Sequence, residues 1–324
     1  MKLTTRILSL ALCLVLVLPF VPQSRADDES RFLWENGLPY VIENGEASIP
    51  WFDWWEHTFP RFSDDIVIPD TLGGYPVTKI VGFHGHRSMV TVSIPASVRT
   101  IHTVAFRNCG KLTNITVAKD NSHFSSENGV LFNKTKTTLI QYPRGKPGNS
   151  YVIPKSVKTI TNEAFYGASI KNVTIPNNVV KIGGGAFKST NLTYVTIPNN
   201  VVKIGRGGFS YTIIYCKKNS AAHKWAKRER PFFSFSKPGK AAKLTFNAGK
   251  GKIGKKSKVT VKNKVGKKIK FPKKPKRKGY KFMGWYTKKK GGIEIKKKYP
   301  DWWMYYHSFV LETKKTYYAR WRKK

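Results

Sequence analysis

The sequence predicts a β-rich fold in which a repeat solenoid with capping segments is followed by a small, strongly basic α+β domain. Three observations predict it: an acidic, aromatic-rich head, a middle region with a fixed repeat period, and a lysine-rich tail. The 324 residues suit about two domains, and 40% hydrophobic residues supply enough apolar material for a core. Carboxylates are scarce at a formal net charge of +41, which disfavours acid–base and metal-dependent catalysis.

The first 26 residues have the pattern of a secretory signal peptide. Lys2 and Arg6 give a basic start, and an apolar run follows at 7–21. The run is shorter than a comfortable membrane-spanning helix, and Ser24 and Ala26 place small residues at the −3 and −1 positions of a cleavage site. We therefore expect an exported protein that is cleaved after Ala26 and has no transmembrane segment.

Charge divides the rest of the chain into three zones. Residues 27–70 carry 11 carboxylates and two arginines, whereas residues 71–236 carry 23 basic and four acidic residues. Residues 237–324 carry 31 basic residues and only three acidic ones. Such charge asymmetry indicates separate functional zones. The predicted segments are a signal peptide at 1–26, an N-terminal cap at 27–66, a solenoid with its C-terminal cap at 67–236, a linker at 237–242 and a basic domain at 243–324.

The middle region repeats with a fixed period. Ile-Pro pairs recur at equal intervals, at 153, 175 and 197, and each proline is followed at the same distance along the chain by Phe165, Phe187 or Phe209. A fixed period of this length is typical of a solenoid, whose stacked coils share one core. Proline ends each strand because it has no N–H to donate. We expect the phenylalanines to stack at strand spacing, roughly 4.8 Å.

The outward residues of the coil strands form a candidate ligand-binding ladder. In the last complete unit Leu192, Val195 and Ile197 face inward, so Tyr194 and Thr196 face outward. An uncharged hydroxyl and amide face suits recognition of a protein or a glycan. The equal alternative is the β-propensity of threonine on a solvated strand. The ladder consists of Thr91, Ser93, Asn114, Thr116, Asn172, Thr174, Tyr194 and Thr196.

These coils resemble the BspA-like leucine-rich repeat family. The resemblance is carried by residues 196–205 and 182–187, while 128–143 resemble that family's β-hairpin insertion. Residues 215–232 resemble its closing strand, helix and cap, and His102 departs from the glycine usual at its position. The resemblance implies a bacterial surface or secreted protein with a leucine-rich-repeat solenoid that adheres to host or bacterial ligands.

The basic tail resembles the internalin B-type repeat, a small β-grasp module of bacterial surface proteins. The string Gly-Tyr-Lys-Phe-Met-Gly-Trp-Tyr-Thr at 279–287 carries the resemblance, which 244–248 opens and 317–321 closes. The resemblance implies an α+β β-grasp domain over 243–324. It departs in an aromatic insertion at 301–309.

The lysines of the tail form the candidate polyanion-binding surface. Solubility needs far fewer than 31 mutually repelling basic residues, so a polyanionic partner accounts for them. Lysine is a flexible point charge suited to diffuse attraction, which argues against specific nucleic-acid recognition. The candidates are Lys273, Lys274, Lys276, Arg277, Lys278, Lys288, Lys289, Lys290, Lys296, Lys297 and Lys298.

Two aromatic clusters are further candidates for contact surfaces. The cluster at 51–55 is expected to cover the open N-terminal end of the solenoid, with sugar stacking or a protein contact as the alternative. The second cluster lies in the insertion, where a contact role and a structural role are equally supported. It consists of Trp302, Trp303, Tyr305 and Tyr306.

The remaining reactive side chains do not assemble a catalytic or metal-binding motif in the sequence. His84, His86 and His102 are interpreted as surface histidines rather than as metal ligands. Cys109 and Cys216 belong to coils too far apart for a disulfide, so we expect two free thiols. No cofactor and no metal are predicted, and the protein is not expected to be an enzyme.

The sequence therefore predicts a non-enzymatic, exported cell-surface binding or adhesion protein. Its solenoid would recognise a host or bacterial surface protein or glycan, and its tail would associate with anionic wall polymers. The alternative is a freely secreted binder of polyanions such as glycosaminoglycans or nucleic acid. Retention on the cell envelope would distinguish the two.

Overall fold

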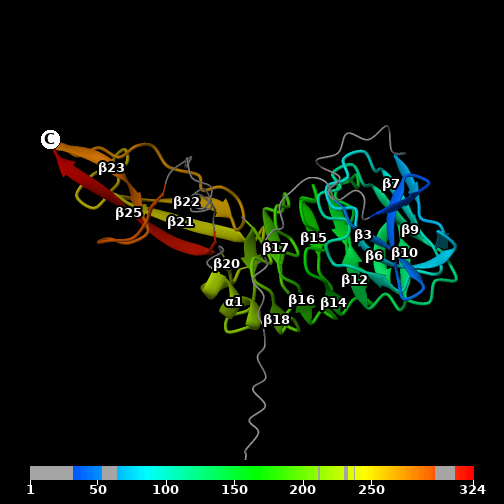
Figure 1. Cartoon of the computed structure of the whole chain (residues 1–324). Helices are drawn as coiled ribbons and strands as arrows, with labels where there is room; N and C mark the ends of the chain where they lie inside the picture. The colour runs from blue at the N-terminus through cyan, green and yellow to red at the C-terminus, as the bar shows by residue number, and fades with distance from the viewer. Residues whose placement is uncertain (1–31, 53–63, 211, 230–232, 237, 296–310) are drawn as a thin grey trace, which may run out of the picture.

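The chain folds into two units that follow one another along the sequence. Figure 1 shows a stack of coils that ends near α1 (Ala221–Glu229), and beyond it a sheet of longer strands that carries the C-terminus. Within the described ranges, no helix has the length and the apolar character needed to cross a membrane. The computed structural model describes residues 32–52, 64–210, 212–229, 233–236, 238–295 and 311–324.

The N-terminal region is an antiparallel meander that leads directly into the parallel stack. Asn-Gly pairs at 36–37 and 44–45 adopt positive φ in its two turns, as tight hairpins require. The third strand pairs in parallel with β6, so parallel pairing already begins at Ala47, within the segment predicted as the cap. The elements are β1 (Leu33–Glu35), β2 (Leu38–Glu43), β3 (Glu46–Trp51), β5 (Thr71–Leu72), β6 (Tyr75–Gly82) and β8 (Thr100–Ile101).

Successive coils stack through short strands in parallel register. Thr159 pairs with Lys181, and Lys181 pairs with Lys203, so equivalent positions of neighbouring repeats lie side by side, which confirms the repeat period. One set of sheets carries the predicted ladder: β4 (Asp65–Val67), β7 (Thr91–Ile94) and β9 (Asn114–Val117), then β13 (Ser150–Val152) and β15 (Asn172–Thr174), then β17 (Tyr194–Thr196), β19 (Ile213–Tyr215) and β20 (Phe233–Ser234). The other side of the coils carries β14 (Thr159–Ile160), β16 (Lys181–Ile182) and β18 (Lys203–Ile204).

A three-stranded antiparallel insertion interrupts the coils, where the sequence predicts a β-hairpin at 128–143. The hairpin turn lies over β9, because the N–H of Ile115 donates to the carbonyl of Gly129 (3.1 Å). The third strand of the insertion continues in parallel with β14, so the insertion is joined to the stack. Its strands are β10 (Phe124–Glu127), β11 (Val130–Asn133) and β12 (Thr138–Gln141).

Aromatic rings run through the core of the solenoid. The rings of Phe165 and Phe187 stack with centroids 4.8 Å apart, and Phe187 and Phe209 stack at 4.9 Å. This confirms the spacing expected from the sequence. Trp225 of α1 meets Phe209 edge-on, and its Nε1–H donates to the carbonyl of Gly205 (2.9 Å). The helix therefore ends the stack by covering its last ring.

The basic unit is a single mixed sheet of five strands. Its order is β22-β21-β25-β23-β24, in which β21 and β25 form a central parallel pair and the other pairs are antiparallel. This order is compatible with a β-grasp fold, but the described part of the unit contains no helix, and the β-grasp assignment stays a prediction. The strands are β21 (Ala241–Asn247), β22 (Lys258–Lys264), β23 (Tyr280–Tyr286), β24 (Glu294–Ile295) and β25 (Lys314–Lys323).

Candidate functional site

The first part of the predicted ladder lies in register on neighbouring strands. Thr91 pairs with Asn114, and Ser93 pairs with Thr116. The Ser93 and Thr116 hydroxyls are hydrogen-bonded to each other (2.8 Å), and Thr91 donates to the Asp65 carboxylate (2.6 Å). These side chains do face away from the core, but part of their hydrogen-bonding capacity is used within the ladder.

The ladder is not continuous, because the insertion covers its middle. Gly129, at φ +75°, lies so close to Asn114 that an added Cβ would overlap that side chain. The N–H of Val117 also donates to the hydroxyl of Ser126 (3.1 Å). The ladder resumes on β15, where Asn172 and Thr174 are exposed. The predicted face is thus divided into separate patches.

Tyr194 is the ladder residue whose environment differs most from the expectation. Its hydroxyl donates to the carbonyl of Ser236 (3.1 Å), and a Cβ on Gly266 of the basic unit would lie 3.3 Å from its ring. Burial raises the pKa of Tyr194. The ring therefore belongs to the junction between the two units rather than to an open face. Thr196, on the same strand, is exposed.

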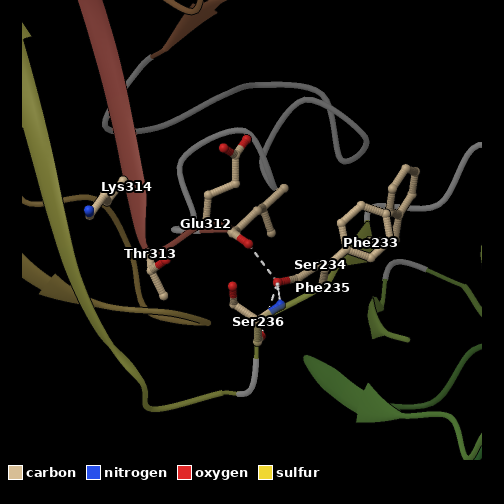
Figure 2. A pocket seen from close by; sticks show the side chains of 8 residues that line it. Phe233, Ser234, Phe235, Ser236, Glu312, Thr313 and Lys314 are labelled. Carbon is tan, nitrogen blue, oxygen red and sulfur yellow. Dashed lines mark hydrogen bonds between the residues drawn. The ribbon is translucent and has the colours of Figure 1, made fainter. Parts of the chain in front are cut away.

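A hydrogen bond also joins the two units. The buried hydroxyl of Ser234 donates to the carbonyl of Leu311 (2.5 Å) and accepts from the N–H of Ser236 (3.1 Å). Figure 2 shows these bonds in a hollow of about 640 Å³ between 233–236 and 311–314. The closing strand of the solenoid and the segment that leads into β25 are thereby fixed to one another.

The basic unit contains a hollow of about 610 Å³ at one end of its sheet, here called the lysine hollow. Among the described residues that line it, none is acidic, and Arg277 lies over the ring of Tyr280 at 3.5 Å from the ring centroid. Stacking holds this guanidinium in place, since an arginine above an aromatic face is electrostatically stabilised. The seven cationic side chains that line the hollow are Lys252, Lys274, Lys276, Arg277, Lys278, Lys281 and Lys324.

Backbone pairing brings these cations together from distant segments. Lys252 and Lys276 exchange two backbone hydrogen bonds of 2.8 Å, and the N–H of Lys324 donates to the carbonyl of Gly279 (3.0 Å). The sequence pointed to the run at 273–278 but missed Lys252, Lys281 and Lys324. For Lys252 and Lys324 the position in the chain gives no signal, because only backbone pairing between distant segments places them beside that run.

The described ones among the other predicted cations do not line this hollow. Lys273 is exposed next to it in sequence, and the exposed Lys288, Lys289 and Lys290 follow the end of β23. Lys296, Lys297 and Lys298 lie outside the described residues, as do Trp302, Trp303, Tyr305 and Tyr306. The structure thus groups four of the predicted cations, Lys274, Lys276, Arg277 and Lys278, in one site.

His86 is not a surface histidine, which corrects the sequence interpretation. Its side chain is only 2% exposed, and its Nδ1 accepts a hydrogen bond from the N–H of Met89 (3.0 Å). Burial lowers the pKa of His86 to about 4. His102 is exposed, as expected. The described residues hold no group of three or more His, Cys, Asp or Glu that would suit a metal ion.

The described part of the aromatic cluster at 51–55 divides between the core and the surface. Phe52 is 3% exposed and contacts Trp34 edge-on (5.5 Å), so it does cover the first coils. Trp51 is 47% exposed and stacks on His84 at 4.7 Å. The remaining members of the cluster, 53–55, lie outside the described residues.

The two described cysteines are free and buried. The thiol of Cys109 donates to the carbonyl of Phe83 (3.0 Å), and burial raises its pKa to about 12. Burial raises the pKa of Cys216 to about 11. Because the thiolate is the nucleophile, both groups are packing residues rather than reactive ones.

Family models match both units. Residues 144–224 match the BspA type leucine-rich repeat region in six copies, and residues 243–304 match the Listeria-Bacteroides repeat domain. No curated protein matches the chain. Repeat regions of the first kind are generally non-enzymatic binding modules, and neither match points to catalysis.

Several solved structures are similar to the chain. A leucine-rich repeat protein from Eubacterium ventriosum is 31% identical over 47% of this chain and 42% of that chain, with a TM-score of 0.41. The pneumococcal vaccine antigen PcpA is 20% identical over 48% and 50%, with a TM-score of 0.37. A leucine-rich cell surface protein from Faecalibacterium prausnitzii is 24% identical over 47% and 53%, with a TM-score of 0.36.

The matched segments span about half the length of these proteins. The internalin B-type assignment of the tail stays a prediction, since the matching model is the broader Listeria-Bacteroides repeat. The repeat period, the stacked coils and the two family matches agree. Residues 144–224 therefore form a BspA type leucine-rich repeat region, and residues 243–304 resemble a Listeria-Bacteroides repeat domain.

Proposed function

We propose that this chain is an exported, non-enzymatic binding protein that attaches to anionic envelope polymers through its basic unit. In this proposal the solenoid recognises a protein or glycan ligand through the patches around Thr91, Thr116 and Thr174. BspA-type repeat proteins are typically surface or secreted proteins, which supports the location. The signal peptide at 1–26 lies outside the described residues and remains a prediction.

The lysine hollow is the observation that carries this proposal. Seven cations around about 610 Å³, with no acidic lining residue among those described, create a strong positive potential at one place on the sheet. Lysines form flexible point charges, and a single stacked Arg277 adds a planar donor. Such a site suits the repeated phosphates or sulfates of a linear polymer, because each anionic group meets several cations without a fixed register.

The alternative function is that of a freely secreted polyanion binder. Both functions use the lysine hollow, so they differ in where the protein resides and not in what it binds. Fractionation of cells into envelope and culture medium distinguishes them. Retention on the envelope, released by salt, supports the first, whereas protein found only in the medium supports the second.

Charge reversal in the full chain tests the hollow itself. The variant Lys274→Glu, Lys276→Glu and Lys278→Glu changes three lining residues. The control Lys255→Glu, Lys256→Glu and Lys258→Glu changes three exposed lysines of the same unit that do not line it. Both variants have the same net charge, so any difference between them reports position rather than total charge.

Beads coated with poly(glycerol phosphate) are washed with rising salt. We expect wild type and control to be retained at physiological salt and released near 1 M, where the Debye length falls from about 8 Å to 3 Å. The hollow variant should be released at clearly lower salt. Equal release of both variants would show that only diffuse charge matters, and retention indifferent to salt would place the attachment elsewhere.

A further inference from the structure

A third hollow lies between the two units, separate from the lysine hollow and from the hollow of Figure 2. It measures about 570 Å³ and lies where the ladder side of the solenoid meets the basic unit. The solenoid contributes Lys171, Asn172, Asn191 and Thr193, and the basic unit contributes Lys267 and Lys268. None of the lining residues of one hollow lines the other. We call this composite space the junction hollow.

Contacts on the floor of the junction hollow hold its two walls in place. Tyr194 donates from its hydroxyl to the carbonyl of Ser236 (3.1 Å), and its ring packs on Gly266. Gly266 has φ +78°, a conformation that favours glycine, and it lies in a loop that is tied back by the bond from Val265 N–H to the carbonyl of Lys240 (3.0 Å). The walls therefore form one preorganised site.

The chemistry of the lining differs from that of the lysine hollow. The solenoid wall presents the exposed side chains of Asn172, Asn191 and Thr193, which both donate and accept hydrogen bonds. Lys171, Lys267 and Lys268 add three exposed positive charges. Among the described lining residues none is acidic, and the apolar ones are not exposed aromatic anchors of the kind that protein partners use.

Amides and hydroxyls beside lysines are complementary to a sugar that carries an acidic group. The amides and the hydroxyl pair with ring hydroxyls, and the lysines pair with a carboxylate. We propose that the junction hollow binds an acidic saccharide unit, with the solenoid wall reading its hydroxyls and the basic unit holding its carboxylate. This goes beyond the attachment proposed above, because it requires both units and different residues.

Calorimetric titration of the full chain at physiological salt tests the proposal. The probes are a hyaluronan hexasaccharide and a hexagalacturonate, which carry carboxylates without sulfates. A highly sulfated chain is avoided because it would bind tail lysines everywhere. Preference for one of the two probes identifies the source of the acidic sugar. A hexaglutamate peptide serves as the non-saccharide probe.

Paired variants separate the two walls. Asn191→Asp changes the solenoid wall and Lys267→Glu changes the basic wall, and each should weaken saccharide binding roughly tenfold. Asn199→Asp and Lys250→Glu are the controls, since both residues are exposed and line neither hollow. We expect the controls to bind within about twofold of wild type, since distant exposed charges are screened.

Three results would overturn the proposal. If neither saccharide binds, the junction hollow is not a saccharide site. If hexaglutamate binds equally well, the hollow accepts any acidic chain and does not recognise a saccharide. If the Asn191→Asp variant binds like wild type, the solenoid wall takes no part, and only the charge of the basic unit explains the binding. None of these results changes what the lysine-hollow variant is expected to do on polymer beads. The proposal for the junction hollow and the proposed attachment through the lysine hollow can therefore be refuted separately.

Discussion

The solenoid and the basic unit build their cores by different rules. In the solenoid the same ring position is filled in coil after coil, so Phe165, Phe187 and Phe209 bury one another. In the basic unit Phe246, Trp285 and Tyr317 pack once, around the two central strands and their neighbour. The difference teaches that a repeated position identifies the core of the solenoid in the sequence, whereas the core of the basic unit has no periodic signal.

The largest expected effect comes from removing one ring of the stack. Phe187 is fully buried between two neighbours, so Phe187→Ala should cost about 3–5 kcal/mol of unfolding free energy. Chemical denaturation, followed by fluorescence and circular dichroism, measures it. Because the two cores are built separately, we expect the loss of stability only in the unfolding transition of the solenoid. An equal shift in the transition of the basic unit would show that the two cores unfold as one.

The second effect depends on pH and on His86. Its pKa is lowered by burial from 6.5 to about 4, against a smaller opposing influence of Asp64. Below pH 6.5 His86 binds a proton in the unfolded chain, whereas in the folded chain it stays neutral until the pH approaches 4. The contribution of neutral His86 to the free energy of unfolding is therefore fully present above pH 6.5. It is lost as the pH falls to 4, and the loss amounts to at most about 3 kcal/mol.

Denaturation at pH 7 and pH 4.5 measures this effect. The variant His86→Asn should lose most of the pH dependence over this range, whereas the exposed His102→Asn should keep it. The unfolding transition of the basic unit should not change between wild type and His86→Asn. A wild-type solenoid equally stable at both pH values would contradict the assignment.

The repeat explains what could be predicted from the sequence and what could not. Its fixed period determines the inward residues, because stacked coils repeat the same burial at each strand. The division of the ladder depends on where the insertion turns, and the close approach of Gly129 to Asn114 has no local signal. The burial of His86 and the place of Lys324 in the lysine hollow likewise depend on contacts between distant segments.

A third, smaller effect concerns the junction. The sequence predicts a linker at 237–242 between the two domains, whereas the structure adds the hydrogen bond from Ser234 to the carbonyl of Leu311. Ser234→Ala leaves that carbonyl without this donor and should cost about 1–3 kcal/mol. Thermal melting of the full chain measures it, with Ser257→Ala, a partly exposed serine of the basic unit, as the control.

Truncation after Ser236 shows how much the junction matters to the solenoid. We expect the shortened chain to unfold cooperatively, because α1 and β20 already close the stack. Its stability should fall by the effect of Ser234→Ala together with the loss of the packing of Tyr194 on Gly266. Aggregation or loss of cooperativity would show that the basic unit is part of the solenoid's cap.

The smallest expected effect is the reactivity of the thiols, which compares the start and the end of the solenoid. Cys109 and Cys216 are buried, with pKa values raised to about 12 and 11, so thiolate is nearly absent at pH 8. In protein that begins at residue 27, a thiol reagent should react with neither group in the native state and with two after denaturation.

Partial reaction at one site alone would locate the less stable end of the stack, because only local opening exposes a buried thiol. Exposure of Cys216 first would indicate that the stack opens from α1, next to the junction. Exposure of Cys109 first would indicate that it opens from the N-terminal coils. Immediate reaction of both in native protein would contradict the buried placement on which the common core of the solenoid depends.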